Sequence, residues 1–155
     1  MVGVGDIMTT EAIHAAEILR QDLPEKKFRV VNLLALSYNA IGTTERKLTQ
    51  KQFDQLFTHD KLIVANFHGY PATLEQILTQ YTDHKRFKVH GYIEKGSTTT
   101  PFEMLRLNQA SRYDLASDVA RAEKRDDLVE KYQKILSDNA AYAKAHGVDQ
   151  DFLEQ

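Results

Sequence analysis

Four segments of the chain carry the apolar and β-branched residues that are typical of strands. They are residues 2–5, 28–34, 61–67 and 87–92. The run Lys61 to Phe67 is nearly uninterrupted in its apolar character after Lys61. This pattern favours a central parallel strand that is covered on both faces.

Helical patterns alternate with these strands. We expect helices over residues 10–21 with Thr9 as the N-cap, 49–57 with a Thr49–Gln52 capping box, 71–81, from Thr100 onward with Pro101 and Glu103 in the first turn, 111–122, and 126–146 before Gly147. Residues 37–48 read as a loop. The alternation predicts an α/β fold with a mainly parallel sheet between two layers of helices.

Length and composition suit one globular domain spanning residues 1–155. The net charge of −2 shows no basic excess, so we expect no nucleic-acid partner. No apolar run approaches a membrane span and the first residues do not resemble a signal peptide, so we expect a cytoplasmic protein without a membrane partner. The chain has no cysteine, which excludes disulfides and thiolate chemistry.

Two nucleotide-binding motifs are incomplete. Gly3 and Gly5 follow a strand and precede a helix, but Met8 stands where a dinucleotide fingerprint needs its third glycine. A tight turn accounts better for these glycines. The hydroxyl-rich loop Gly96, Ser97, Thr98, Thr99 and Thr100 lacks the Gly-Lys-Ser/Thr ending of a phosphate-binding loop. It either caps the following helix or offers backbone N–H groups to an anion or an interface.

Polar and aromatic residues follow the third and fourth strands. His68 and Tyr70 come after the third strand, and His90, Tyr92 and Glu94 lie at the end of the fourth. The carboxyl ends of parallel strands are where such folds bind ligands, so these side chains are candidates for acid–base work or phosphate binding. An isolated histidine is more often a hydrogen-bonded structural residue. No short histidine spacing supports a metal site.

Two motifs resemble the phosphoketolase family. One is Asn66-Phe67-His68-Gly69-Tyr70-Pro71, and the other runs from Val89 to Met104 and continues through Asn108 to Arg112-Tyr113. The segment from Phe28 to Asn32 resembles a strand of the family's C-terminal domain. The resemblance covers nearly the whole chain and weakens in the last helix.

The resemblance implies a piece of a larger enzyme that splits xylulose 5-phosphate or fructose 6-phosphate with inorganic phosphate. The products are acetyl phosphate and a shorter aldose phosphate. It also implies that thiamine diphosphate and magnesium are bound by two earlier domains in a homodimer or higher oligomer, and not by this chain. We therefore expect no catalytic, cofactor-binding or metal residue here and no activity of the isolated chain.

For the fold, the resemblance implies a domain of the transketolase C-terminal type. Such a domain has an antiparallel edge strand before the others, so we expect this chain to show four parallel strands in the order 2-1-3-4 without it. His68, Tyr70, His90, Tyr92, Glu94 and residues 96–100 are then candidates for docking on the earlier domains. Two alternatives remain open, a module that binds a phosphate-bearing effector and a purely structural interface domain.

Overall fold

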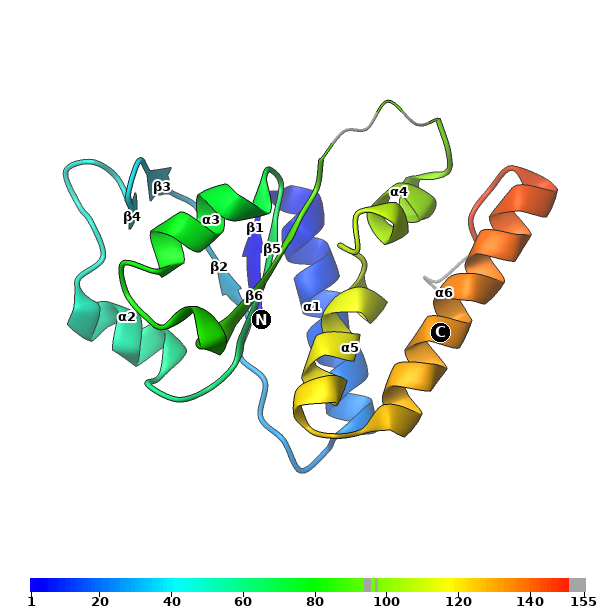
Figure 1. Cartoon of the computed structure of the whole chain (residues 1–155), viewed down its shortest axis with the longest axis horizontal. Helices are drawn as coiled ribbons and strands as arrows, with labels where there is room; N and C mark the ends of the chain where they lie inside the picture. Colours follow the sequence, from blue (N-terminus) through cyan, green and yellow to red (C-terminus); the bar gives the residue numbers. More distant parts are fainter. Residues whose placement is uncertain (94–95, 97, 151–155) are drawn as a thin grey trace.

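The computed structural model describes residues 1–93, 96 and 98–150. Its main sheet holds β1 (Val2–Val4), β2 (Val31–Asn32), β5 (Ile63–Phe67) and β6 (Phe87–Gly91) in the order β2-β1-β5-β6. All three pairings are parallel (Figure 1). Counted along the chain, this is the expected order 2-1-3-4, which is confirmed.

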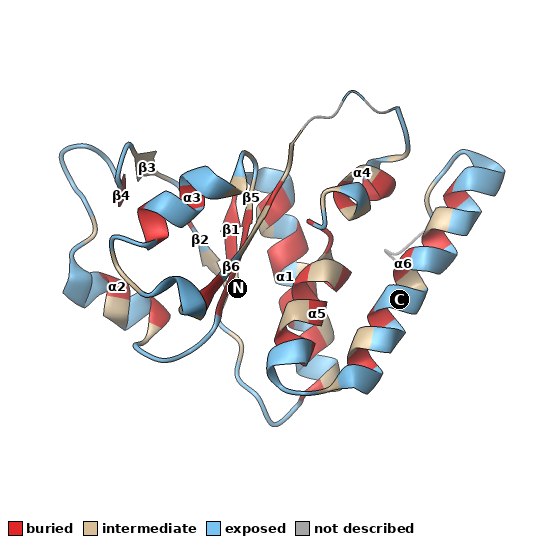
Figure 2. Cartoon of the chain, in the orientation of Figure 1, coloured by how far each residue is buried: buried red, intermediate tan, exposed pale blue. Residues whose placement is uncertain are grey.

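Helices cover both faces of this sheet. One face carries α1 (Asp6–Asp22), α4 (Pro101–Leu107), α5 (Arg112–Ala122) and α6 (Asp126–His146), and the other carries α2 (Gln50–Phe57) and α3 (Pro71–Leu78). A short 3-10 helix, η1 (His84–Arg86), precedes β6. Buried residues lie between the layers, while the outer side of α6 is exposed (Figure 2). The predicted three-layer α/β/α fold is confirmed.

Local sequence signals position several helices as expected. Thr49 and Gln52 form the predicted capping box at the start of α2. Ser111 and Asp114 form another at the start of α5. Gly147 ends α6 in the left-handed conformation, which glycine adopts at little cost. No helix in the described part of the chain is long and apolar enough to cross a membrane.

The strand limits differ from the prediction. The ladder includes only Val31–Asn32 of the predicted strand 28–34, because β1 begins at Val2 and offers no strand residue opposite residues 28–30. Likewise β5 begins at Ile63 and not at Lys61. The predicted loop 37–48 contains part of a hairpin, β3 (Leu36–Ser37) with β4 (Ala40–Ile41), whose two-residue strands are too short to show a period in the sequence.

Two helix limits were also wrong. Helix α1 begins at Asp6 with Gly5 as its N-cap, so Thr9 lies inside the helix, where its hydroxyl donates to Asn32 Oδ1 at 3.2 Å. Helix α3 ends at Leu78. The predicted last residue, Tyr81, instead turns its hydroxyl to accept a hydrogen bond from the backbone N–H of Ile41 at 3.2 Å.

Candidate functional site

The carboxyl ends of β1, β5 and β6 pack closely at one edge of the sheet. Gly91, the last residue of β6, leaves no room for a side chain. A β-carbon there would lie 2.4 Å from the carbonyl oxygen of Gly69 and 2.4 Å from Pro71 Cδ. The turn after β5 and the start of α3 are therefore held directly against the end of β6.

His68 and Tyr92 meet on this edge. Their ring centroids are 5.4 Å apart with an interplanar angle of 76°, an edge-to-face contact. The backbone N–H of His68 donates to Val4 at 2.9 Å, which extends the ladder past β5. His68 also lies over Gly5, where a β-carbon would be 2.9 Å from the histidine β-carbon. The sequence thus positions His68 through β1, β5 and β6 together.

Four large side chains that follow the ends of strands are exposed. Ile7 is 54% exposed, Tyr70 67%, Leu34 89% and Tyr38 91%. Ile7, Leu34 and Tyr70 follow the carboxyl ends of β1, β2 and β5, which share one edge of the main sheet (Figure 1). Tyr38 instead lies in the turn of the β3–β4 hairpin. We call Ile7, Leu34, His68, Tyr70 and Tyr92 the strand-end face. Apolar groups exposed together in this way are typical of interaction surfaces.

His90 has a different environment from His68. Its side chain is 13% exposed and its Nε2 lies 2.8 Å from Asp118 Oδ2 on α5. Burial alone would raise the pKa of Asp118, but the hydrogen bond and charge of His90, with the charge of Arg121, outweigh burial and hold this pKa below its usual value. His90 thus ties β6 to α5 and is largely buried, and an interface or anion-binding role for it stays a prediction.

We expect Asp118→Asn to lower the free energy of unfolding by about 2 kcal/mol at pH 7, because a charge-assisted hydrogen bond is lost. The pKa of Asp118 is lower in the folded protein, so its ionised form stabilises the fold above the unfolded pKa. That contribution disappears as the pH falls through the folded pKa.

Urea unfolding at pH 7 and near pH 3 checks this dependence. The gap between the wild type and Asp118→Asn should narrow at the lower pH. Asp138→Asn is the control, because Asp138 lies in an exposed pair with Lys134 on α6. A gap of equal size at both values of pH would contradict the prediction.

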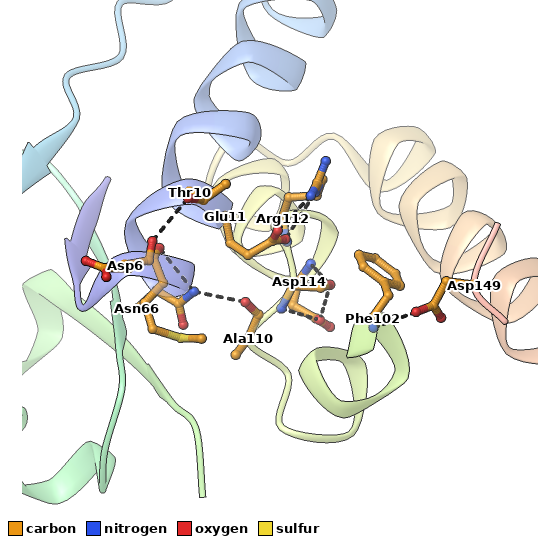
Figure 3. Close-up of polar contacts among 11 residues, drawn as sticks. Asp6, Thr10, Glu11, Asn66, Phe102, Ala110, Arg112, Asp114 and Asp149 are labelled. Carbon is orange, nitrogen blue, oxygen red and sulfur yellow. Dashed lines mark hydrogen bonds and ion pairs between the residues drawn. The ribbon is translucent and has the colours of Figure 1, made fainter. Parts of the chain in front are cut away.

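Buried polar side chains join α1, β5 and the start of α5 (Figure 3). Asn66, fully buried in β5, donates from Nδ2 to the carbonyl oxygen of Ala110 at 2.9 Å. Glu11 in α1 accepts from the backbone N–H of Arg112 at 2.7 Å and from its guanidinium at 2.7 and 3.1 Å. These bonds fix α1, β5 and the start of α5 to one another. Sequence reasoning missed them because the partners lie far apart in the chain.

The predicted capping of α4 by Thr100 is wrong. Thr100 is the N-cap residue, but its side chain makes no cap hydrogen bond and its hydroxyl donates to Asp149. Asp149 Oδ2 accepts from the backbone N–H of Phe102 at 2.8 Å, so this distant carboxylate caps the helix (Figure 3). Glu103, expected to complete a capping box, instead pairs with Arg106 at 2.8 Å. A residue 47 positions away leaves no local signal of this kind.

The rest of the predicted loop is described in part. Thr98 and Thr99 are exposed, as is Gly96, which has a positive φ of 70°. Glu94 and Ser97 were also predicted to contribute, and they lie outside the described residues. An anion or interface role for this loop stays a prediction. The amide of Phe102 is already bound by Asp149.

Comparison with known proteins gives one consistent result. A family model described as the XFP C-terminal domain matches residues 1–155. Probable phosphoketolase 1 of Nostoc sp. is 39% identical over 97% of this chain and 19% of the relative. Probable phosphoketolase 2 of Rhizobium meliloti is 35% identical over 94% of this chain and 19% of the relative. Probable phosphoketolase of Gloeobacter violaceus is 41% identical over 77% of this chain and 15% of the relative.

The chain spans about a fifth of the length of these relatives. The match extends from the first residue to the last and includes both motifs that suggested the resemblance. The chain therefore belongs to the family of phosphoketolase C-terminal domains.

Proposed function

We propose that this chain acts as the C-terminal domain of a phosphoketolase and docks through its strand-end face on the parts of that enzyme that carry the chemistry. The whole enzyme would cleave xylulose 5-phosphate or fructose 6-phosphate with phosphate, giving acetyl phosphate and an aldose phosphate. The observation that carries the docking role is the exposure of Ile7, Leu34 and Tyr70 at one edge of the sheet. In relatives about five times as long, other parts of the protein are available to cover them.

The proposal assigns thiamine diphosphate and magnesium to other domains. Among residues 1–93, 96 and 98–150, no three His, Asp or Glu side chains gather where they could hold a metal ion. The described residues therefore offer no ready-made cluster of protein ligands for a metal ion. When bound elsewhere in the enzyme, thiamine diphosphate would supply the carbanion chemistry, and this domain would support the assembly of that site.

The same proposal assigns the partners of the domain. They are the preceding domains of the same polypeptide, in a homodimer or higher oligomer. Binding of a phosphate-bearing effector is the weaker alternative, because the helix terminus nearest the hydroxyl-rich loop already binds the carboxylate of Asp149. The second alternative, a purely structural interface domain, would also dock on the preceding domains. It differs from the proposal only in predicting that docking has no effect on the activity of the enzyme.

The docking role is testable in a chimera of the Nostoc relative in which this chain replaces the matching region. We expect His68→Ala with Tyr70→Ala to lower acetyl phosphate formation about tenfold, because exposed aromatic side chains at an interface often contribute over 1 kcal/mol each. The matched control is His59→Ala, which removes an exposed imidazole just before β5, at the opposite edge of the sheet.

Activity and oligomeric state should be measured on the same samples. The control should match the unmodified chimera in both. If the double variant also matches it in both, the strand-end face has no docking role. Loss of assembly together with activity supports docking as the cause.

A further inference from the structure

A pocket of about 590 Å³ lies at the opposite edge of the sheet, where the strands begin. The pocket is partly open to solvent and reaches the edge of the sheet, where its walls include Val2, Ile63 and Val64. It is lined by the residues that precede β2 and β5 and by residues of α2 and α5, which lie on opposite faces of the sheet. On the strand side these are Lys27, Phe28, Arg29, Lys61, Leu62 and Ile63.

The hydrogen-bond ladder of β1 leads directly into this pocket. The Met1 amine donates to the carbonyl oxygen of Arg29 at 2.8 Å, and the Met1 carbonyl accepts from the N–H of Val31 at 3.0 Å. These are the contacts of a parallel ladder that continues through Met1. Burial, and then the charge of Arg20, lower the pKa of the Met1 amine to about 6. A neutral peptide N–H would make the same bond without this penalty.

The strand register identifies which residues would neighbour a strand that occupied the pocket. Val2 pairs with Val31 on one side and with Ala65 on the other. If β1 continued before Met1 in the same register, the first preceding residue would lie between Arg29 and Ile63. The second would lie between Phe28 and Leu62, and the third between Lys27 and Lys61. Each of these neighbours lines the pocket, which therefore has the position and the walls of one more stretch of central strand.

Two differences between sequence and structure have the same cause. Residues 28–29 and 61–62 carry strand-forming sequence but lie outside β2 and β5. They flank the pocket on either side, so both lack the partner that would fill it. The relatives, about five times the length of this chain, contain further polypeptide that could supply such a partner.

We propose that in the longer protein the residues preceding Met1 fill this pocket as a continuation of β1. The extended strand would lie between residues 27–29 and 61–63. The preceding chain would therefore enter the domain at the edge of the sheet opposite the strand-end face. The inference rests on the proposed function only in requiring a longer polypeptide. It does not depend on docking or on activity.

Side-chain alternation defines the chemistry of the segment. Met1 packs with the cluster on the α1 and α5 face, and Val2 with the cluster on the α2 and α3 face. The first residue before Met1 therefore faces Leu56 and Phe57, and the second faces Val119 and Ala122. Both positions should be apolar.

The charged residues that line the pocket are mostly cationic. Lys26, Lys27, Arg29 and Lys61 line it, against Glu123 as the acidic residue among its walls. Lys26 pairs with Glu123 and Lys61 with Asp60, while Lys27 has no ion-pair partner among the described residues. An acidic side chain at the third position would complement this charge.

The first test uses this chain with Asp-Val-Val placed directly before Met1, compared with Asp-Pro-Gly at the same place. Proline donates no ladder hydrogen bond and glycine fills no space, so the second extension is a matched control. In the proposed register, the N–H groups of Arg29 and Val64 gain carbonyl acceptors from the second and first added residues. The N–H groups of Val31 and His68 already have theirs.

Hydrogen exchange followed by NMR reads out these four amides. We expect Asp-Val-Val to slow exchange at Arg29 and Val64 by at least about tenfold and to raise Tm by roughly 3 to 6 °C. Val31 and His68 should change less, and Asp-Pro-Gly should give neither effect. Equal exchange at Arg29 and Val64 with both extensions would overturn the proposal. So would protection that appears only with dimerisation in sedimentation, because a second copy would then be the occupant.

The second test addresses the natural segment. In the chimera with the Nostoc relative, exchange measured by mass spectrometry should be slower for peptides covering residues 28–30 and 62–64 than in the 155-residue chain. Unchanged exchange there would overturn the proposal even if the chimera is active. Inactivity with strong protection would instead count against the proposed function alone.

Discussion

Glu11→Ala should lower the free energy of unfolding by about 3 to 5 kcal/mol, because it leaves a buried guanidinium without its carboxylate. Glu11 and Arg112 have side chains that are only 4% and 13% exposed and are joined at 2.7 Å. The same carboxylate also accepts from the first backbone N–H of α5. One substitution thus removes a salt bridge, a helix cap and the link between α1 and α5.

Thermal unfolding provides the measurement, and Tm should fall by roughly 10 °C. Glu17→Ala is the matched control, since Glu17 is exposed on the same helix and alanine favours helices. That control should stay within about 0.5 kcal/mol of the wild type. Equal losses for Glu11→Ala and Glu17→Ala would show that the buried pair does not hold these helices together.

Gly91→Ala should lower stability by about 1 to 3 kcal/mol and should also disturb the strand-end face. The new β-carbon would meet the carbonyl oxygen of Gly69 and the ring of Pro71, both at 2.4 Å. Neither group can rotate away, because one is backbone and the other a closed ring. The turn that positions His68 and Tyr70 must therefore move.

Two readouts separate this effect from a general loss of stability. NMR signals of the His68 and Tyr92 rings should shift in Gly91→Ala. They should stay in place in Gly147→Ala, where the residue has a positive φ of 72° but the added carbon meets no atom within 4 Å. The control should lose about 1 kcal/mol from backbone strain alone. Unshifted ring signals in Gly91→Ala would contradict the close packing described for this edge.

The sheet could be predicted from the sequence because its signals are local. The apolar run before His68 favoured a central strand, and alternation with helices favoured parallel pairing. The order of the strands followed from the phosphoketolase resemblance, not from the pattern itself. The same local signals misplaced the start of β2, since the extent of a strand depends on whether a partner lies beside it.

The candidate site was predicted less completely, because its decisive contacts join distant residues. Glu11 and Arg112 are 101 positions apart, and Asp149 caps a helix 47 positions earlier. For His90, position in the chain suggested a place beside His68. Its ring is instead held by Asp118, a partner that no spacing rule identifies. Burial and long-range pairing, which only the fold determines, thus separate surface residues from structural ones.

The most direct test of the central claim, that this domain supports chemistry carried by the rest of a phosphoketolase, is an acetyl phosphate assay on three proteins. They are the isolated chain, the Nostoc relative truncated to lack its matching region, and the chimera that carries this chain there. Each receives xylulose 5-phosphate, phosphate, thiamine diphosphate and magnesium. We predict an active chimera, a truncated protein at least about tenfold slower, and no product from the isolated chain. Product from the isolated chain, or a truncated protein as fast as the chimera, would contradict the account.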